Sequence, residues 1–352
     1  MGSGQARTGH TSVTIRSTAM QVLILGGTGA GGRALVEHLQ ATAPAVDLTV
    51  VSRTATSLPG IGSMVTGHYG DLARCAAFRR RLEAVEVVVH LADGLSVLQQ
   101  GRHAADAVLA DELMAATVRL AVAARAVRVP RLVHVSSIEA ICGEEDARLL
   151  TEADGPRPAS LYGRSKLWLE QSLTALLKGS DTRLTVVRTP LVYGPGKAGS
   201  LSRLLQLADT ALPLPLAGLA NRRSLLAVRN LAGALAAVVR AGPGAPVGVF
   251  HVHDGPALST TEIVGTLRAG LGRPCRLFPA GAAMSGAARR LPLLGATARR
   301  LFGSLELCDA HFRRTFGWTP AVETGRALAA LAKAYLAEPG RDVIGTAVPS
   351  AR

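Results

Sequence analysis

A glycine-rich turn near the start of the chain constrains the fold more than any other feature. Residues 26–32 read GGTGAGG; they follow the apolar run at 21–25 and precede a helical stretch at 33–41. Glycines here let the chain turn tightly and its backbone approach a phosphate, while the helix N-terminus offers free N–H groups. The turn therefore predicts a βαβ unit that binds the pyrophosphate of a dinucleotide. The residues expected to contact it are Gly26, Thr28, Gly29, Ala30, Gly31 and Gly32.

Apolar runs and helical stretches alternate along the rest of the chain, which indicates an α/β fold with a doubly wound parallel (Rossmann) sheet. The run at 85–91 is apolar almost throughout, as expected for a central strand buried on both faces. Further strands are expected within residues 48–51, 60–66, 131–135 and 184–187, and helices within 104–127 and 161–177.

The pattern also predicts how the chain is divided. Residues 20–190 are expected to form the NAD(P)-binding Rossmann domain, and 191–340 mainly a smaller substrate-binding lobe, with some chain returning to the Rossmann sheet. Within that lobe we expect the segments 247–252, 260–271 and 322–336. Residues 1–19 are expected to be a disordered extension and 341–352 a flexible tail.

Composition excludes several classes of protein. Of the 352 residues 48% are hydrophobic and 18% charged, which suits a globular chain. The net charge of +14 fits either a solvated arginine-rich surface or attraction of anionic ligands. The basic residues are scattered, with no interleaved aromatic platform, so no nucleic acid is expected.

The cysteine, histidine and hydropathy patterns indicate whether the chain binds a metal and in which cellular compartment it is found. The four cysteines are far apart and the histidines lack metal-ligand spacing, so we expect no disulfide framework and no metal site. No apolar run reaches the ~18–20 residues of a membrane span, and the first residues do not resemble a secretory signal. A cytoplasmic protein is expected.

The residues at the end of the second strand indicate which dinucleotide, NAD(H) or NADP(H), the chain binds. An enzyme that selects NAD usually places an acid here, whereas this chain has Ser52 followed by Arg53. Arg53 could hold a 2′-phosphate, so NADP(H) is preferred and NAD(H) stays possible; a solvated loop arginine is the alternative. After the third strand, Asp71 is expected to accept a hydrogen bond from the adenine, or else to cap a helix.

A tyrosine and a lysine share one helix face at Tyr162 and Lys166. Tyrosine titrates near pH ~10, and a nearby ammonium favours its phenolate. Tyr162 is therefore the candidate acid/base. Both Tyr162 and Lys166 are also expected to contact the cofactor, Lys166 at the nicotinamide ribose. Ser137, at a strand's carboxyl end, is the candidate for polarising the substrate oxygen, with Ser136 as second choice. Trp168 is expected to pack against the sheet.

Together these motifs resemble the extended short-chain dehydrogenase/reductase family, also called the NAD-dependent epimerase/dehydratase family. The resemblance runs from residue 21 to 336 and includes GDL at 70–72, VVVHLAD at 87–93, HVSSI at 134–138, YGRSK at 162–166 and RTPLVYGPG at 188–196. It implies further cofactor contacts at Leu72, Leu91, Ala92, Pro190 and Val192, and substrate contacts at Ser200, Arg222 and Arg223.

Within the family the chain is most similar to UDP-sugar 4-epimerase-like and 4-ketoreductase proteins. The resemblance implies hydride transfer at a ring carbon of a nucleotide sugar, such as 4-keto reduction. Three alternatives stay open: a nucleotide-sugar 4-epimerase, a ketoreductase of a secondary metabolite, and a non-catalytic NADP-binding sensor. Relatives often form homodimers through the two long helices, so a homodimer is possible here.

Overall fold

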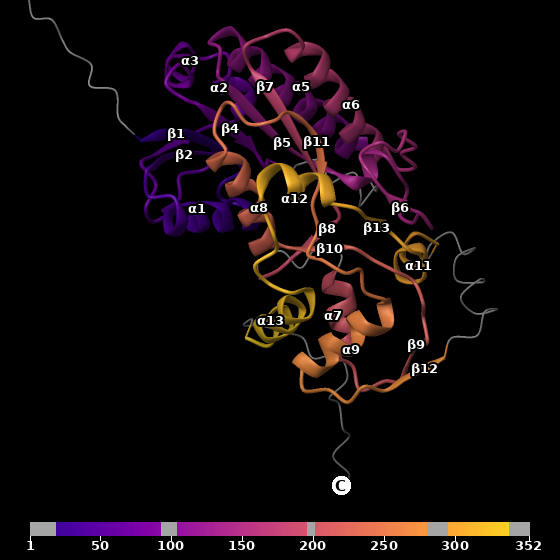
Figure 1. The fold of residues 1–352 in the computed structure, drawn as a ribbon. Helices are drawn as coiled ribbons and strands as arrows, with labels where there is room; N and C mark the ends of the chain where they lie inside the picture. Colours follow the sequence, from indigo (N-terminus) through magenta and orange to yellow (C-terminus); the bar gives the residue numbers. More distant parts are fainter. Residues whose placement is uncertain (1–18, 93–103, 196–200, 280–294, 338–352) are drawn as a thin grey trace, which may run out of the picture.

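The centre of the molecule is a seven-stranded parallel sheet in the order β3-β2-β1-β4-β5-β7-β11 (Figure 1). The computed structural model describes residues 19–92, 104–195, 201–279 and 295–337. The strand order reverses between β1 and β4, and open sheets of this kind bind ligands beyond the carboxyl ends at such a point. The expected doubly wound sheet is confirmed. Its strands are β1 (Met20–Leu25), β2 (Val46–Ser52), β3 (Ser63–Thr66), β4 (Val87–His90), β5 (Arg131–Ser137), β7 (Arg183–Thr189) and β11 (Gly248–His251).

Helices cover both faces of the sheet. Successive side chains of β1 point to opposite faces, so each face has its own apolar core. Val22 and Ile24 pack with α1 (Ala30–Thr42), α8 (Val228–Arg240) and α12 (Ala310–Phe316). Leu23 and Leu25 point to the other face. That face is covered by α2 (Tyr69–Leu72), α3 (Ala76–Leu82), α5 (Ala104–Ala126) and α6 (Leu161–Leu177).

A separate apolar core lies in the lower part of the molecule in Figure 1. It joins α7 (Leu201–Asp209), α9 (Thr260–Gly270) and α13 (Thr324–Leu336). Two short parallel pairs belong to this core: β8 (Leu191–Tyr193) with β10 (Leu225–Ala227), and β9 (Leu214–Ala217) with β12 (Leu277–Pro279). A third pair, β6 (Leu149–Leu150) with β13 (Glu306–Leu307), packs instead in a small cluster with Ile138 and Ile141. Helix α11 (Gly295–Phe302) lies near β13 and β6 in Figure 1.

One expected lobe segment belongs to the Rossmann sheet instead. The strand predicted at 247–252 is β11, which pairs in parallel with β7 at the edge of the large sheet. Arg131, at the start of β5, holds the segment that leads into β11. Its guanidinium donates to the carbonyls of Pro243 (3.1 Å) and Pro246 (3.2 Å). An apolar run shows that a strand forms, but not which sheet it joins.

The expectation that Trp168 packs against the sheet is wrong, because 48% of the residue is exposed. The buried face of α6 carries Tyr162, Lys166, Leu169 and Leu173, at helical spacing. Trp168 falls outside this face.

Candidate functional site

The glycine turn lies between β1 and α1, and close backbone contacts explain its composition. Gly26 has φ +83°, and a Cβ there would lie 2.7 Å from the Ala92 nitrogen just beyond β4. A Cβ on Gly32 would lie 2.2 Å from the Gly26 oxygen. Any side chain at either position would therefore force the turn apart from β4 or from α1. Gly31 has room for a Cβ, since the nearest atom, a methyl carbon of Leu231, would lie 3.6 Å from it.

The start of α1 fits a bound pyrophosphate. Its N-cap is Gly29, no side chain caps the helix, and its first turn holds no acid. The first N–H groups of a helix have no partner within it, so these are available to an anion. Leu91 and Ala92 directly follow β4 and lie against Gly26. The described residues thus fit the dinucleotide expected from the sequence.

The other expected cofactor residues also follow the carboxyl ends of strands. Arg53 comes directly after β2 and is exposed. Asp71, exposed, and Leu72 belong to the short helix α2, which follows β3. Pro190 lies between β7 and β8, and Val192 is a buried residue of β8.

Tight packing brings the three catalytic candidates to one end of the sheet. Ser137 ends β5, and its Oγ accepts a hydrogen bond from the N–H of Glu139 (3.2 Å) in the short 3₁₀ helix η1 (Ile138–Ala140). A Cβ on Gly163 would lie 2.2 Å from the Glu139 carbonyl oxygen, so η1 lies directly on the first turn of α6. Tyr162 and Lys166 are buried on that helix, with the Lys166 Nζ 5.6 Å from the centroid of the tyrosine ring.

Ser136 differs from Ser137 in what its hydroxyl contacts. Its Oγ donates to the Glu170 carboxylate (2.5 Å) in the core. Arg188 of β7 donates to the same carboxylate from Nε (3.0 and 3.1 Å) and from Nη2 (2.6 Å). Ser136 therefore joins β5 to α6 and β7, which leaves Ser137 as the better candidate for contact with a substrate.

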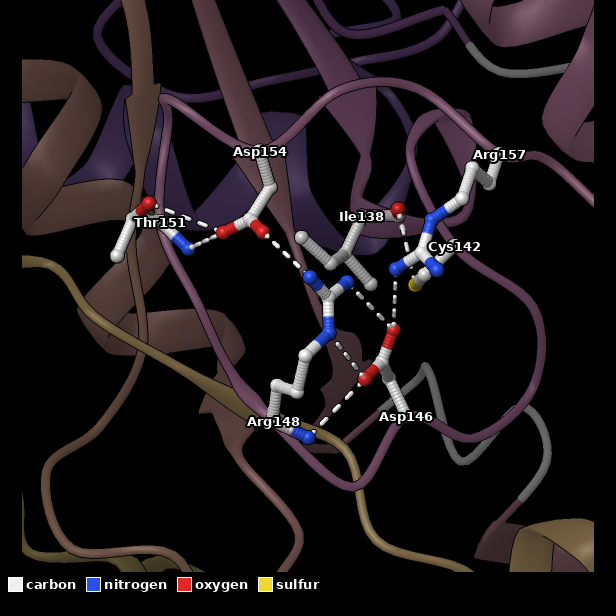
Figure 2. Close-up of polar contacts among 7 residues, drawn as sticks. All are labelled: Ile138, Cys142, Asp146, Arg148, Thr151, Asp154 and Arg157. Carbon is white, nitrogen blue, oxygen red and sulfur yellow. Dashed lines mark hydrogen bonds and ion pairs between the residues drawn. The ribbon is translucent and has the colours of Figure 1, made fainter.

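A loop between η1 and α6 is held by its own ion pairs (Figure 2). Arg148 binds Asp146 and Asp154 (both 3.1 Å), and Arg157 binds Asp146 (3.1 Å). A cavity of about 440 Å³ lies beside this loop, lined by residues 142–146, Ser160 and Arg299 among others. Its contact with Ser160, the N-cap of α6, places it next to the turn that carries Tyr162.

The two arginines expected to bind substrate differ in their surroundings. Arg223 donates to the carbonyls of Gly303 (3.0 Å) and Glu144 (3.3 Å), so its guanidinium reaches the loop that follows Ser137. Burial lowers the pKa of Arg223 to about 10. Arg222 is exposed and pairs with Glu306 (3.4 Å). Ser200, the remaining expected substrate contact, lies outside the described residues.

Comparison with known proteins decides the family. Residues 22–250 match the model of the NAD dependent epimerase/dehydratase family, which is more than half of the chain. The chain belongs to that family. It is thus an enzyme of the extended short-chain dehydrogenase/reductase type, and the resemblance seen in the motifs is confirmed.

Relatives in the family include a UDP-glucose 4-epimerase of Vibrio cholerae. It is 29% identical over 325 residues, covering 91% of this chain and 97% of the relative. A solved UDP-N-acetylglucosamine 4-epimerase from Bacillus cereus superposes with a TM-score of 0.69 at 18% identity, covering 89% of this chain and 98% of that one. The solved structure of MoeE5 in complex with UDP-glucose and NAD superposes with a TM-score of 0.67 at 23% identity, covering 90% of this chain and 99% of that one. At such identities the two structures establish the fold.

Several polar residues that are buried or half-buried in the structure were given no catalytic or binding role from the sequence. Glu139 accepts a hydrogen bond from Ser160 Oγ (3.0 Å), and burial raises its pKa. His90 and His134 stack on adjacent strands with their Nδ1 atoms 3.1 Å apart. Glu170 follows Lys166 by one helical turn, and that i+4 spacing was the one signal in the sequence that could have drawn attention to it.

Two negative findings apply to the part of the chain that the structure describes. Within it, no group of three or more His, Cys, Asp or Glu side chains is arranged to hold a metal ion. In the same residues, no helix combines the length and apolar character needed to cross a membrane.

Proposed function

We propose that this enzyme transfers hydride at a ring carbon of a nucleotide sugar, with Ser137, Tyr162 and Lys166 as its catalytic residues. The packing of η1 on the first turn of α6 carries the proposal, because it joins the strand end that holds Ser137 to the turn that holds Tyr162. The bound nicotinamide would supply the chemistry of exchanging a hydride with the substrate carbon.

Each of the three side chains has a role that its surroundings support. The Lys166 ammonium lies 5.6 Å from the Tyr162 ring centroid, where its charge favours the phenolate. Tyr162 then takes or returns the proton of the substrate hydroxyl. Ser137 Oγ accepts from Glu139 N–H, so its own O–H is available to donate to the substrate oxygen. Arg223, and the more exposed Arg222, are proposed to meet the diphosphate.

Among the possible outcomes, 4-epimerisation is supported by similarity to the Vibrio cholerae UDP-glucose 4-epimerase over 97% of its length. Net 4-keto reduction is the second candidate, and Arg53 favours it. An exposed arginine at the end of β2 suits the 2′-phosphate of NADPH, the cofactor on which a net reductase draws. From the position of Arg53 we propose NADP(H) as the preferred cofactor; NAD(H) is the alternative, and is the cofactor that a 4-epimerase would retain.

One incubation series separates these outcomes. The full-length protein is mixed with UDP-glucose and UDP-N-acetylglucosamine in the presence of NAD⁺ or NADP⁺, and with a panel of UDP- and dTDP-4-keto sugars in the presence of NADH or NADPH. A new sugar without net cofactor change identifies an epimerase, and stoichiometric loss of reduced cofactor identifies a reductase. Cofactor binding with neither reaction would overturn the proposal; the secondary-metabolite ketoreductase and the sensor would then be the remaining candidates.

We also propose a homodimer formed through α5 and α6. Both helices expose large apolar side chains: Val108 and Leu109 on α5, Leu161 and Trp168 on α6. Asp111 and Arg164 line a hollow of about 420 Å³ between these helices. In a two-fold arrangement each charge could meet the opposite charge of the second copy, which makes the surface self-complementary.

The division of the chain is proposed as expected from the sequence, with residues 20–190 binding the cofactor and 191–340 mainly binding substrate. The separate apolar core around α7, α9 and α13 supports this division. The cytoplasm is the proposed compartment, since all four cysteines are free thiols.

A further inference from the structure

Glu139 of η1 contacts both segments that carry the catalytic candidates. Its main-chain N–H donates to Ser137 Oγ (3.2 Å) at the end of β5. Its carbonyl oxygen lies against the first turn of α6, since a Cβ on Gly163 would be 2.2 Å from it. Its side chain is only 15% exposed and also reaches the start of α6. One residue thus joins the end of β5 to the start of α6 through both its backbone and its carboxylate.

The Glu139 carboxylate orients the N-cap of α6. Ser160 is the N-cap residue, and its Oγ accepts a hydrogen bond from the N–H of Gly163 (2.9 Å). The same hydroxyl donates to Oε2 of Glu139 (3.0 Å). A hydroxyl has a single hydrogen, so donation to the carboxylate turns a lone pair of Ser160 Oγ toward the helix N–H. The carboxylate therefore fixes the geometry in which the helix begins.

Helix α6 takes this carboxylate from another element, in contrast to α9. In α9 the N-cap Ser259 donates to Glu262 of the helix's own first turn (2.9 Å), in a capping box. The first turn of α6 holds no acid, and Glu139 lies 21 residues before its N-cap. A negative charge near a helix N-terminus is favourable. The cap of α6 therefore depends on the segment that follows β5.

Arg300 of α11 also faces this carboxylate, at a longer distance. Its Nη2 lies 3.9 Å from Oε1 of Glu139 and 3.6 Å from Oε1 of Glu144, beyond hydrogen-bond distance of either. The Arg300 side chain is 33% exposed, and partly exposed ion pairs of this length contribute little. Arg300 is thus a charged neighbour of Glu139, whereas Ser160 is a hydrogen-bond partner.

We propose that Glu139 is a positioning residue, which sets the spacing of Ser137 and Tyr162 through its backbone and through the cap of α6. This inference rests on the proposed function, in which both residues meet the oxygen of the reacting ring carbon. A proton-transferring group must lie within hydrogen-bond reach of that oxygen, and a displacement of about 1 Å can cost about 10²-fold in rate. In this role Glu139 acts through Ser160 and needs no contact with the substrate.

The test compares kcat, KM and cofactor Kd in the full-length enzyme, with the nucleotide sugar on which the wild type is most active. Glu139→Ala and Ser160→Ala should each lower kcat by about 10- to 10²-fold, with KM and Kd little changed. The double variant should fall no further than Ser160→Ala, because the carboxylate acts through that hydroxyl. Glu139→Gln should stay within a few-fold of wild type, since its amide oxygen can still accept from Ser160.

Two further variants serve as controls. Glu262→Ala removes the corresponding carboxylate from the cap of α9 and should leave kcat unchanged. Arg300→Gln removes the charged neighbour and should lower kcat less than Ser160→Ala does. If Glu139→Ala fails to fold, Glu139→Asp replaces it. That carboxylate is one methylene too short to reach Ser160 Oγ, so kcat should fall there and be retained in Glu139→Gln.

Several results would overturn the inference. A fall in Glu139→Gln as deep as in Glu139→Ala would assign the effect to the charge or proton of the carboxylate. Additive falls in the double variant, or a cofactor Kd that rises as kcat falls, would show that Glu139 does not act through the cap. Tyr162→Phe tests the proposed function separately. Wild-type turnover by Tyr162→Phe refutes that function, whereas an inactive Tyr162→Phe beside a fully active Glu139→Ala refutes only the positioning role.

Discussion

The carbonyl oxygen of Glu139 occupies the space where a side chain on Gly163 would begin, at 2.2 Å from an ideal Cβ. This contact sets the distance between the strand end that holds Ser137 and the helix that holds Tyr162. It also explains why a residue with poor helix propensity lies within the first turn of α6.

Gly163→Ala should therefore separate η1 from α6. We expect a loss of about 1–3 kcal/mol in the free energy of unfolding, as for other overpacked sites, together with a large fall in kcat. Gly325→Ala is the matched control, because that helical glycine has open space around it and alanine should stabilise it by about 0.5–1 kcal/mol. Urea unfolding of both variants checks this; equal stabilisation by the two substitutions would refute the close contact of η1 with α6.

Arg53→Asp should move cofactor preference from NADP(H) toward NAD(H). A charge-assisted hydrogen bond contributes about 1.5–3 kcal/mol, so the ratio of the two Kd values should change by about tenfold or more. Fluorescence titration with each reduced cofactor measures the ratio. Arg74→Asp removes an exposed arginine of the same charge from the segment between α2 and α3, and it should leave the ratio unchanged. An unchanged ratio in Arg53→Asp would exclude the 2′-phosphate contact.

Trp168→Glu should dissociate the proposed homodimer, since it places a charge in the apolar surface of α5 and α6. Sedimentation velocity should show a dimer for the wild type and a monomer for this variant. Leu212→Glu serves as control, because Leu212 is also exposed but lies on neither helix. A wild-type protein that is monomeric at every concentration would rule the dimer out.

His251 should make the fold sensitive to acid. Burial, then Arg188, lower its pKa from 6.5 to about 3, so the unfolded chain binds a proton in this range and the folded chain does not. The stabilisation is complete above pH 6.5 and is lost as the pH falls toward 3. Between pH 7 and pH 5 the wild type should lose about 2 kcal/mol more than His251→Gln. Parallel pH slopes in denaturant unfolding would contradict this.

Local patterns were sufficient to predict the sheet. The run at 85–91 contains β4, which is buried throughout and lies between β1 and β5. The glycine turn connects β1 to α1 as predicted. Glycine is required at positions 26 and 32 because a Cβ there would clash with the backbone of Ala92 and of Gly26, respectively. Strands of two or three residues, such as β6 and β13, were not predicted, because so short a segment has no measurable period.

Contacts between residues far apart along the chain could not be predicted from the sequence. That β11 joins β7 depends on Arg131 reaching the carbonyls of Pro243 and Pro246, more than a hundred residues away along the chain. The commitment of Glu170 to Arg188 likewise links α6 to a later strand. A spacing rule can mark Glu170 as a neighbour of Lys166, but only the fold shows which cation it binds.

The central claim is tested most directly by Tyr162→Phe, assayed with the nucleotide sugar on which the wild type is most active. The variant should bind the cofactor with nearly unchanged Kd, because the glycine turn is untouched. Its kcat should fall by about 10²–10⁴-fold, the usual contribution of a general acid/base. A kcat within a few-fold of wild type, at unchanged cofactor affinity, would contradict the proposed role of Tyr162.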